Sequence, residues 1–142
     1  MMKEQGAQVS LEYLLIFSIS LIIMIAFTLP LLQESMDNTF DVSDSIKTKS
    51  DLSKLALAIK QVYGEGQGSK QTVKLYIDKP IRVSVSNNHI SSNLKLKNGD
   101  NKKIYLSFKS KLKASSFNLD KGANIFIVEW PVGNENMVIY HK

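Results

Sequence analysis

Cysteine is absent from the 142-residue sequence, and histidine occurs only at His89 and His141. A chain without cysteine forms neither a disulfide framework nor a thiolate metal site. Both histidines lie at predicted turns or strand ends with no carboxylate at ligand spacing, so an exposed or capping role is favoured over metal binding. No serine lies in a G-x-S-x-G elbow. We therefore expect no enzymatic activity, no bound metal and no cofactor.

Charge is absent from residues 13–32, a run of twenty positions. As a helix that rises about 1.5 Å per residue, this run spans roughly 30 Å, the thickness of a hydrocarbon core. A secretory signal peptide is the competing interpretation, but its apolar region is shorter and a small-residue cleavage site follows it. Here the small residues Gly6 and Ala7 precede the run. The sequence therefore predicts a helix that can cross a membrane and that stays on the chain after cleavage at these positions.

Proline is also scarce, and one of the three prolines, Pro30, lies within the apolar run. Because proline removes a backbone hydrogen bond, we expect a kink or local unwinding between Ala26 and Pro30. Beyond the run, apolar residues recur at steps of three and four, which predicts that the helix continues. These residues are Phe40, Ile46, Leu52, Leu55, Ala56, Ile59, Val62 and Tyr63. The glycines of GEGQGS at 64–69 end the pattern and favour a helix cap and a flexible turn over a phosphate-binding loop.

After residue 69 the apolar period changes to two, which is typical of strands with one buried face. Segments 72–77, 81–86, 89–97, 103–109, 113–119, 124–130 and 137–141 are the expected strands. They predict an antiparallel sheet of about five to seven strands. Trp130 is expected to pack at a strand end, with a surface anchor as the alternative. A sheet this small needs a second layer, for which the amphipathic half of the helix is the natural cover. The helix residues placed against it are Phe40, Ile46, Leu52, Leu55, Ile59 and Val62.

The net charge of +5 belongs mainly to the second half, since residues 71–142 carry twelve basic and five acidic residues. Seven lysines lie between positions 95 and 113, with Tyr105 and Phe108 among them. Basic and aromatic residues together can bind nucleic acid. Strand alternation instead favours burial of Phe108, so a solvated basic face is preferred to a surface that binds polyanions such as DNA. The residues of that second interpretation are Lys102, Lys103, Lys109 and Lys111.

Glu12 is the one charged residue at the threshold of the apolar run, and an anchor alone does not require it. One interpretation is a solvated glutamate near the positive N-terminal end of the helix. The other is that Glu12 gains a partner when helices bundle. Cleavage just before Gln8 would create an ammonium group one helical turn from Glu12, and pairing between neighbouring copies would favour one axial register.

The stretch QVSLEY at 8–13, preceded by Gly6 and Ala7 and followed by an uncharged helix, resembles the class III signal peptide of archaeal type IV pilin-like proteins. The resemblance is strongest over residues 3–32. It implies a prepilin peptidase that cuts between Ala7 and Gln8 and leaves the helix intact. Members of this group often have glycine before the glutamine, so cleavage after Gly6 is the alternative. Glu12 then matches the acid that sets the register of assembly.

The residue patterns and the resemblance agree on the fold and the organisation of the chain. The expected fold class is α+β, a pilin-like lollipop in which a long N-terminal helix packs its C-terminal half on a small antiparallel β-sheet head. A leader at 1–7 precedes a transmembrane or filament-core helix at 8–32. The amphipathic half of the helix at 33–63, a glycine-rich linker at 64–70 and the β head at 71–142 follow. Helix packing is assigned to Tyr13, Ser18, Ser20, Ala26 and Pro30.

The function implied by these features is that of a major or minor pilin in a surface filament that serves adhesion. The partners would be copies of the chain or related pilins, the prepilin peptidase and the membrane before assembly. The subunit would be a single-pass membrane protein first and part of an extracellular filament afterwards, with its head outside the cell. A monomeric membrane-anchored binding module is the first alternative. A pseudopilin or archaellum-like component is the second.

Overall fold

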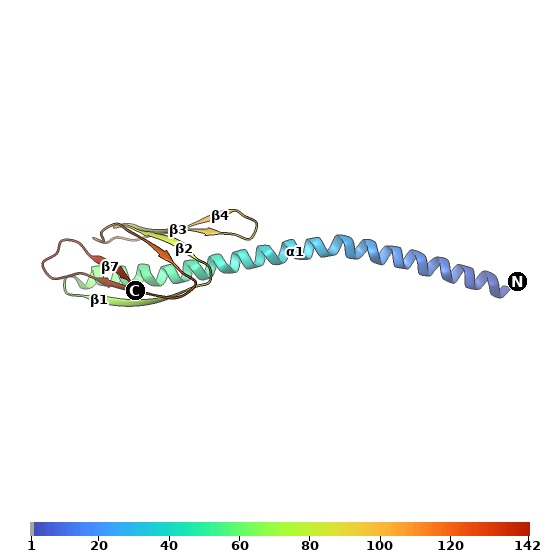
Figure 1. Ribbon diagram of the computed structural model, residues 1–142, viewed down its shortest axis with the longest axis horizontal. Coiled ribbons are helices and arrows are strands. Elements are labelled where there is room, and N and C mark those ends of the chain that lie inside the picture. Colours follow the sequence, from blue (N-terminus) through green and yellow to red (C-terminus); the bar gives the residue numbers. More distant parts are fainter. Residues whose placement is uncertain (1) are drawn as a thin grey trace. The chain divides into compact units, whose positions relative to one another are not determined.

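The computed structural model describes residues 2–142, with side chains described from Gln5 onward, so Met1 and the side chains at 2–4 of the predicted leader lie outside the described residues. The fold class is α+β, as predicted: one long helix precedes a small antiparallel β head (Figure 1). Two compact units divide the chain, Met1–Phe40 and Asp41–Lys142. The elements are α1 (Met2–Glu65), β1 (Lys70–Ile77), β2 (Ile81–Val85), β3 (His89–Lys95), β4 (Asn101–Ser107), β5 (Ser115–Leu119), β6 (Gly122–Glu129) and β7 (Val138–His141).

In the first unit, α1 is helical without interruption through Pro30. Of the kink or local unwinding predicted between Ala26 and Pro30, the unwinding is therefore wrong, and the kink stays a prediction. An interior proline costs one hydrogen bond and a close contact with the preceding turn, and the leucines at 29, 31 and 32 favour continuation of the helix on both sides of it. The helix also continues two residues beyond the predicted end at 63.

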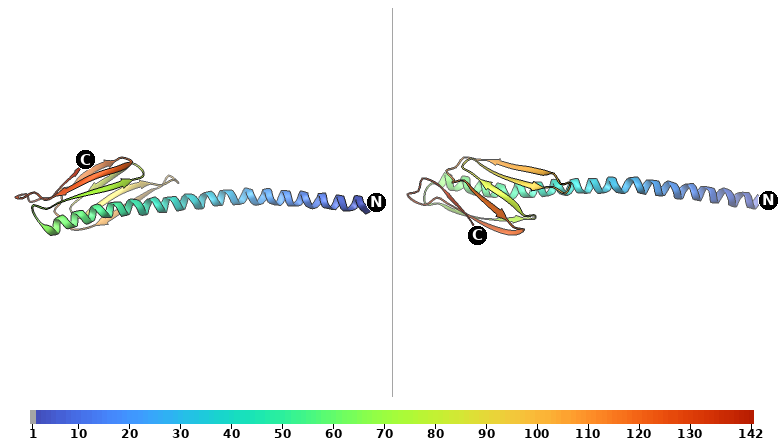
Figure 2. Two further views of the ribbon diagram at one scale, coloured as in Figure 1. Left: turned by 90° about the horizontal axis from the view of Figure 1, so that it is seen from below. Right: turned by 45° about the horizontal axis from the view of Figure 1, so that its top comes forward.

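In the second unit, the seven strands lie near the seven predicted segments but form two sheets. The three-stranded sheet has the order β1-β6-β7, and the four-stranded sheet has the order β4-β3-β2-β5. All pairs of neighbouring strands are antiparallel. Strands β1 and β2 are consecutive but belong to different sheets, so residues 78–80 connect the two sheets and do not form a hairpin. Figure 2 shows both sheets along the segment of α1 that belongs to this unit.

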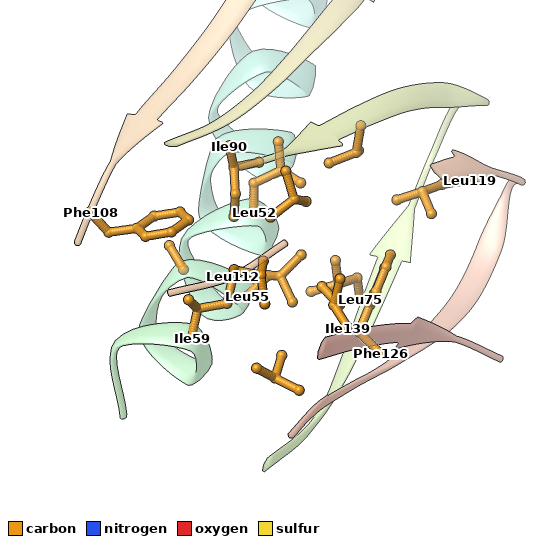
Figure 3. Packing of buried hydrophobic residues seen from close by; sticks show 14 of the residues in the cluster. Leu52, Leu55, Ile59, Leu75, Ile90, Phe108, Leu112, Leu119, Phe126 and Ile139 are labelled. Carbon is orange, nitrogen blue, oxygen red and sulfur yellow. The ribbon is translucent and has the colours of Figure 1, made fainter. Parts of the chain in front are cut away.

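The core of the second unit lies between α1 and the inner faces of the two sheets. Leu52, Leu55 and Ile59 of the helix point toward Leu75 and Phe126 of one sheet and toward residues of the other (Figure 3). Burying a side chain of this size contributes about 1.5–3 kcal/mol. The other buried members named in the figure are Ile90, Phe108, Leu112, Leu119 and Ile139. Trp130 packs just after the end of β6, where its ring stacks on Tyr63 with centroids 5.9 Å apart, as the strand-end prediction requires.

Ile46 is an exception to the predicted helix–sheet contact, since its side chain is 63% exposed, while Phe40, which was also placed against the sheet, belongs to the first unit and is 47% exposed. The buried face of α1, followed back from Leu52, passes through Ser45 and Asp41. At about 100° per residue, Ile46 lies roughly 120° away from that face. The spacing of apolar residues therefore predicted the wrong buried face for this part of the helix, because the buried positions of the helix are polar here.

Polar contacts fix α1 to two turns of the head. The Asp41 carboxylate, which is buried, accepts a 2.9 Å hydrogen bond from the backbone N–H of Lys97 in the turn after β3. Lys79, in the connection between the sheets, forms a 2.6 Å ion pair with Asp44. A charge-assisted hydrogen bond to a buried carboxylate is among the stronger polar contacts, so Asp41 helps to define where the β3–β4 hairpin lies on the helix.

The glycine-rich segment after α1 forms a helix cap and a turn, which confirms the cap that the sequence predicted. Gly66 has φ = 89°, and its N–H donates to the carbonyl of Val62 at 3.0 Å. The N–H of Gly68 donates to the carbonyl of Trp130, and the N–H of Trp130 donates to the carbonyl of Ser69. A glycine in the left-handed region after the last helical residue is a common helix C-cap.

We expect Gly66→Ala to destabilise the head by about 1–2 kcal/mol, because alanine is disfavoured at φ = 89°. No atom lies within 4 Å of the position that its Cβ would occupy, so the backbone alone causes the loss. Gly64→Ala is the matched control: Gly64 lies inside α1 with equal space, and alanine there should stabilise by about 0.5–1 kcal/mol. Urea unfolding followed by Trp130 fluorescence measures both, and shifts of the same sign would contradict the cap assignment.

Candidate functional site

The apolar part of α1 is a surface that the chain's own fold does not cover. Its large side chains from position 9 to position 32 are exposed, and none of the most apolar window of the helix is buried. The helix is long enough and apolar enough to cross a membrane. Water-soluble proteins rarely expose so large a continuous apolar area. This surface therefore needs lipid or other protein around it.

The residues assigned to processing and register all lie on this exposed helix. Gly6, Ala7 and Gln8 are within α1, and Gln8 is one helical turn from Glu12. Tyr13 is 70% exposed. Among the side chains that the structure describes, no cation lies within ion-pair distance of the Glu12 carboxylate. Glu12 therefore has no charged partner among the side chains at 5–142.

The hydroxyl groups of the apolar helix are hydrogen-bonded within it. Ser18 Oγ donates to the carbonyl of Leu14 at 2.8 Å, and Thr28 Oγ1 donates to the carbonyl of Met24 at 2.6 Å. This pattern removes the cost of an unpaired hydroxyl in an apolar environment. The other residues assigned to packing, Ser20, Ala26 and Pro30, are exposed on the same helix. Small side chains at such positions allow helices to approach closely.

The four lysines of the predicted polyanion surface occupy two places in the head. Lys102 and Lys103 begin the edge strand β4, whereas Lys109 and Lys111 follow its other end. Lys111 lines a shallow pocket with Glu135, and its Nζ lies 5.9 Å from the centre of the Trp130 ring. At about 3.3 Å per residue, Lys102 and Lys109 lie roughly 20 Å apart along an extended chain. They are better described as two groups than as one patch.

A pocket of about 370 Å³ lies between α1 and β4, and it was not predicted from the sequence. Ser45, Ile46 and Lys49 line it from the helix, and residues 102–105 line it from the strand. Three lysines, at 49, 102 and 103, surround it, and no acidic residue does. Ser45 and Lys49 belong to no recognisable sequence motif. They come close to β4 only in the folded chain, because that strand lies more than fifty positions further on.

The histidines are occupied by contacts inside the head. The ring of His89 stacks on Tyr105 with centroids 5.0 Å apart, and its Nδ1 lies 2.6 Å from Asn88 Oδ1. His141 Nε2 lies 2.9 Å from the Oδ1 of the buried Asn124, and its ring stacks on Phe126. Within residues 5–142, no three histidine, aspartate or glutamate side chains gather closely enough to hold a metal ion. Both rings thus serve as structural contacts.

Comparisons with known proteins give no match to this chain among protein families, curated proteins or solved structures.

Proposed function

We propose that the chain is a pilin, a structural subunit of an archaeal type IV pilus-like surface filament. The apolar part of α1 first anchors the subunit in the membrane. A prepilin peptidase cuts between Ala7 and Gln8, and the subunit then polymerises through the same helix. The observation that carries the proposal is the Q-x-S-x-E-Y pattern at 8–13 at the start of an apolar helical surface that the fold leaves uncovered.

The same surface suits both stages because lipid and a bundle of helices are both apolar environments. Moving one large apolar side chain out of water contributes about 1.5–3 kcal/mol in either case. Between lipid and bundle, the difference comes from close packing and from polar partners, because lipid tails are as apolar as leucine. A hydroxyl that is already hydrogen-bonded to the backbone of its own helix, such as that of Ser18, adds no unpaired polar group in lipid or in a bundle.

Glu12 is the residue whose energetic cost depends on whether a charged partner is present. A carboxylate at the edge of a membrane helix reaches the headgroup region and costs little there. Within a bundle of helices it is removed from water and needs an opposite charge. The ammonium group created at Gln8 by processing provides that charge on a neighbouring copy. Processing and assembly are thereby linked, because an uncut chain has no ammonium group at Gln8.

In the filament, the second unit forms the outer surface, and its basic side chains determine what the filament adheres to. The head would face the cell exterior before and after assembly. Positively charged residues favour contact with anionic surfaces through long-range attraction, which salt weakens. This assigns polymerisation to α1 and adhesion to the head.

Intact-mass and N-terminal analysis of sheared extracellular material and of membranes from the native cell tests the proposal. We expect a chain that begins at Gln8 in the sheared fraction, and a start at Ala7 would assign the alternative cleavage site after Gly6. The amino terminus should be free, since cyclisation of Gln8 would remove the proposed partner of Glu12. The membrane fraction provides the unassembled pool as an internal control.

The other outcomes select between the remaining functions. A processed chain found only in membranes would favour a membrane-anchored binding module that does not polymerise. A processed chain in a short filament needed for secretion or swimming would favour the pseudopilin or archaellum-like alternative. An unprocessed chain confined to membranes would contradict the leader assignment itself.

A further inference from the structure

We propose that the pocket between α1 and β4 binds an acidic sugar unit of an anionic polysaccharide. The site is defined by Ser45, Ile46 and Lys49 of the helix and by residues 102–105 of the strand, and we call it the α1–β4 pocket. This proposal rests on the adhesive role proposed above and states which class of partner the head would bind. Binding can be measured on unassembled subunits, so a failure to bind and a failure to polymerise are separate results.

The charge of the pocket is the first argument. Lys49, Lys102 and Lys103 line it, and no carboxylate of residues 5–142 forms an ion pair with any of them. Other lysines near this part of the helix are compensated: Lys47 pairs with Asp78 at 3.6 Å, and Lys79 pairs with Asp44 at 2.6 Å. Three uncompensated ammonium groups around one hollow attract an anion, and the attraction is stronger in a concave site than on a flat surface.

An unpaired hydroxyl is the second argument. Ser45 Oγ is buried, and it is the one buried side-chain polar atom without a hydrogen-bond partner in the part of the chain whose side chains are described. Buried polar groups are normally paired, so each exception requires an explanation. Ser45 is one of the residues that line the pocket, so its unpaired hydroxyl belongs to the wall of this site. A ligand with hydroxyl or acid oxygens supplies the missing partner.

The shape and the remaining lining favour a sugar. A volume of about 370 Å³ lies at the small end of the range for ligand sites. Ile46 and Ile104 give the pocket an apolar wall, which suits the C–H face of a sugar ring. Tyr105 lines the same pocket and is half exposed, while His89 stacks against its ring and holds it in place. An aromatic ring with one face supported offers the other face for stacking.

The outer face of the four-stranded sheet continues from the pocket and fits a chain of sugars. Lys103 lies beside Asn93, which lies beside Arg82, across β4, β3 and β2. Tyr105 begins the next row, which continues with Ser91, Ser84 and Ser116. Neither row contains an acidic residue. Serine hydroxyls and asparagine amides both donate and accept hydrogen bonds, as the hydroxyls along a whole polysaccharide require, whereas the phosphates of a nucleic acid require donors and only its bases require both. This difference favours a polysaccharide over nucleic acid.

Titration of the detergent-solubilised full chain with fluorescently labelled alginate oligosaccharides, which are uronic acid polymers, tests the proposal. We expect saturable binding that weakens with salt, and no binding of neutral dextran oligosaccharides of equal length. Lys102→Glu with Lys103→Glu should weaken alginate binding at least tenfold. Lys109→Glu with Lys111→Glu makes the same change in net charge beyond the other end of β4 and should leave the affinity within twofold of the unaltered chain.

Two further measurements make the result decisive. Ser45→Ala should weaken binding about fivefold while leaving the head folded, whereas an unchanged affinity would contradict a role for this hydroxyl in binding. Equal losses in the two double variants would show attraction to net charge and overturn the site. Binding of oligothymidylate as tight as that of alginate would replace the polysaccharide with nucleic acid, and no binding of alginate would overturn the proposal.

Discussion

Glu12→Ala should abolish surface filaments while leaving the subunit processed and inserted in the membrane. In a bundle the Gln8 ammonium group would lose its partner, and removal of one member of a buried charge pair costs about 3–5 kcal/mol. At 1.4 kcal/mol per tenfold change, each contact between subunits would weaken by more than about a hundredfold. Because filament growth repeats this loss at every subunit, sheared material should contain no detectable chain. Immunoblots of the sheared and membrane fractions measure the ratio of assembled to membrane-bound subunits.

Glu34→Ala is the matched control for this experiment. Glu34 is also an exposed glutamate on α1, but it lies beyond the C-terminal end of the uncharged run, far from the proposed chain end at Gln8. We expect normal filaments from this variant. Glu12→Gln keeps the size of the side chain but removes its charge, so it should resemble Glu12→Ala if charge pairing is the cause. Normal filaments from Glu12→Ala would contradict the assembly role and favour a simple anchor.

The sequence predicts the elements of this fold well, because their signals are local. A run without charge, a period of three to four and then a period of two mark one helix and seven strands, and each signal needs only neighbouring residues. Division of the strands into two sheets was not predicted. The pairing of β1 with β6 joins Lys70 to Glu129, almost sixty positions apart, and no pattern within either strand specifies that partner.

The two candidate sites differ in the same way. Glu12, Gln8 and the apolar surface of α1 lie within one stretch of sequence, so they were found without the fold. The α1–β4 pocket was missed because Ser45 and Lys49 meet Lys102 only through tertiary packing. The period of the helix was also misleading here: apolar Ile46 is exposed beside the pocket, and polar Ser45 is buried. A buried polar residue on an inward helix face can be recognised only when the face is known.

Leu55→Ala should destabilise the head by about 3–5 kcal/mol, because Leu55 is fully buried and packs between the two sheets. A domain of this size is typically stable by only about 5–15 kcal/mol, so the head of this variant would lie close to unfolding. Trp130 is the only tryptophan, and it is 9% exposed against Tyr63, so its fluorescence reports the head and not the apolar helix. Urea titration of the full chain in detergent should show a midpoint lowered by more than about 1 M.

Leu57→Ala provides the control on the same helix, two positions away. Leu57 is 63% exposed, and its replacement should change stability by less than about 0.5 kcal/mol. Equal midpoints for the two variants would contradict the packing of α1 against the sheets. Membrane insertion should be unaffected in both, because the apolar run at 13–32 is unchanged. If Leu55→Ala also retains processing at Gln8 but yields no filaments, then a folded head is required for assembly even though the helix makes the contacts.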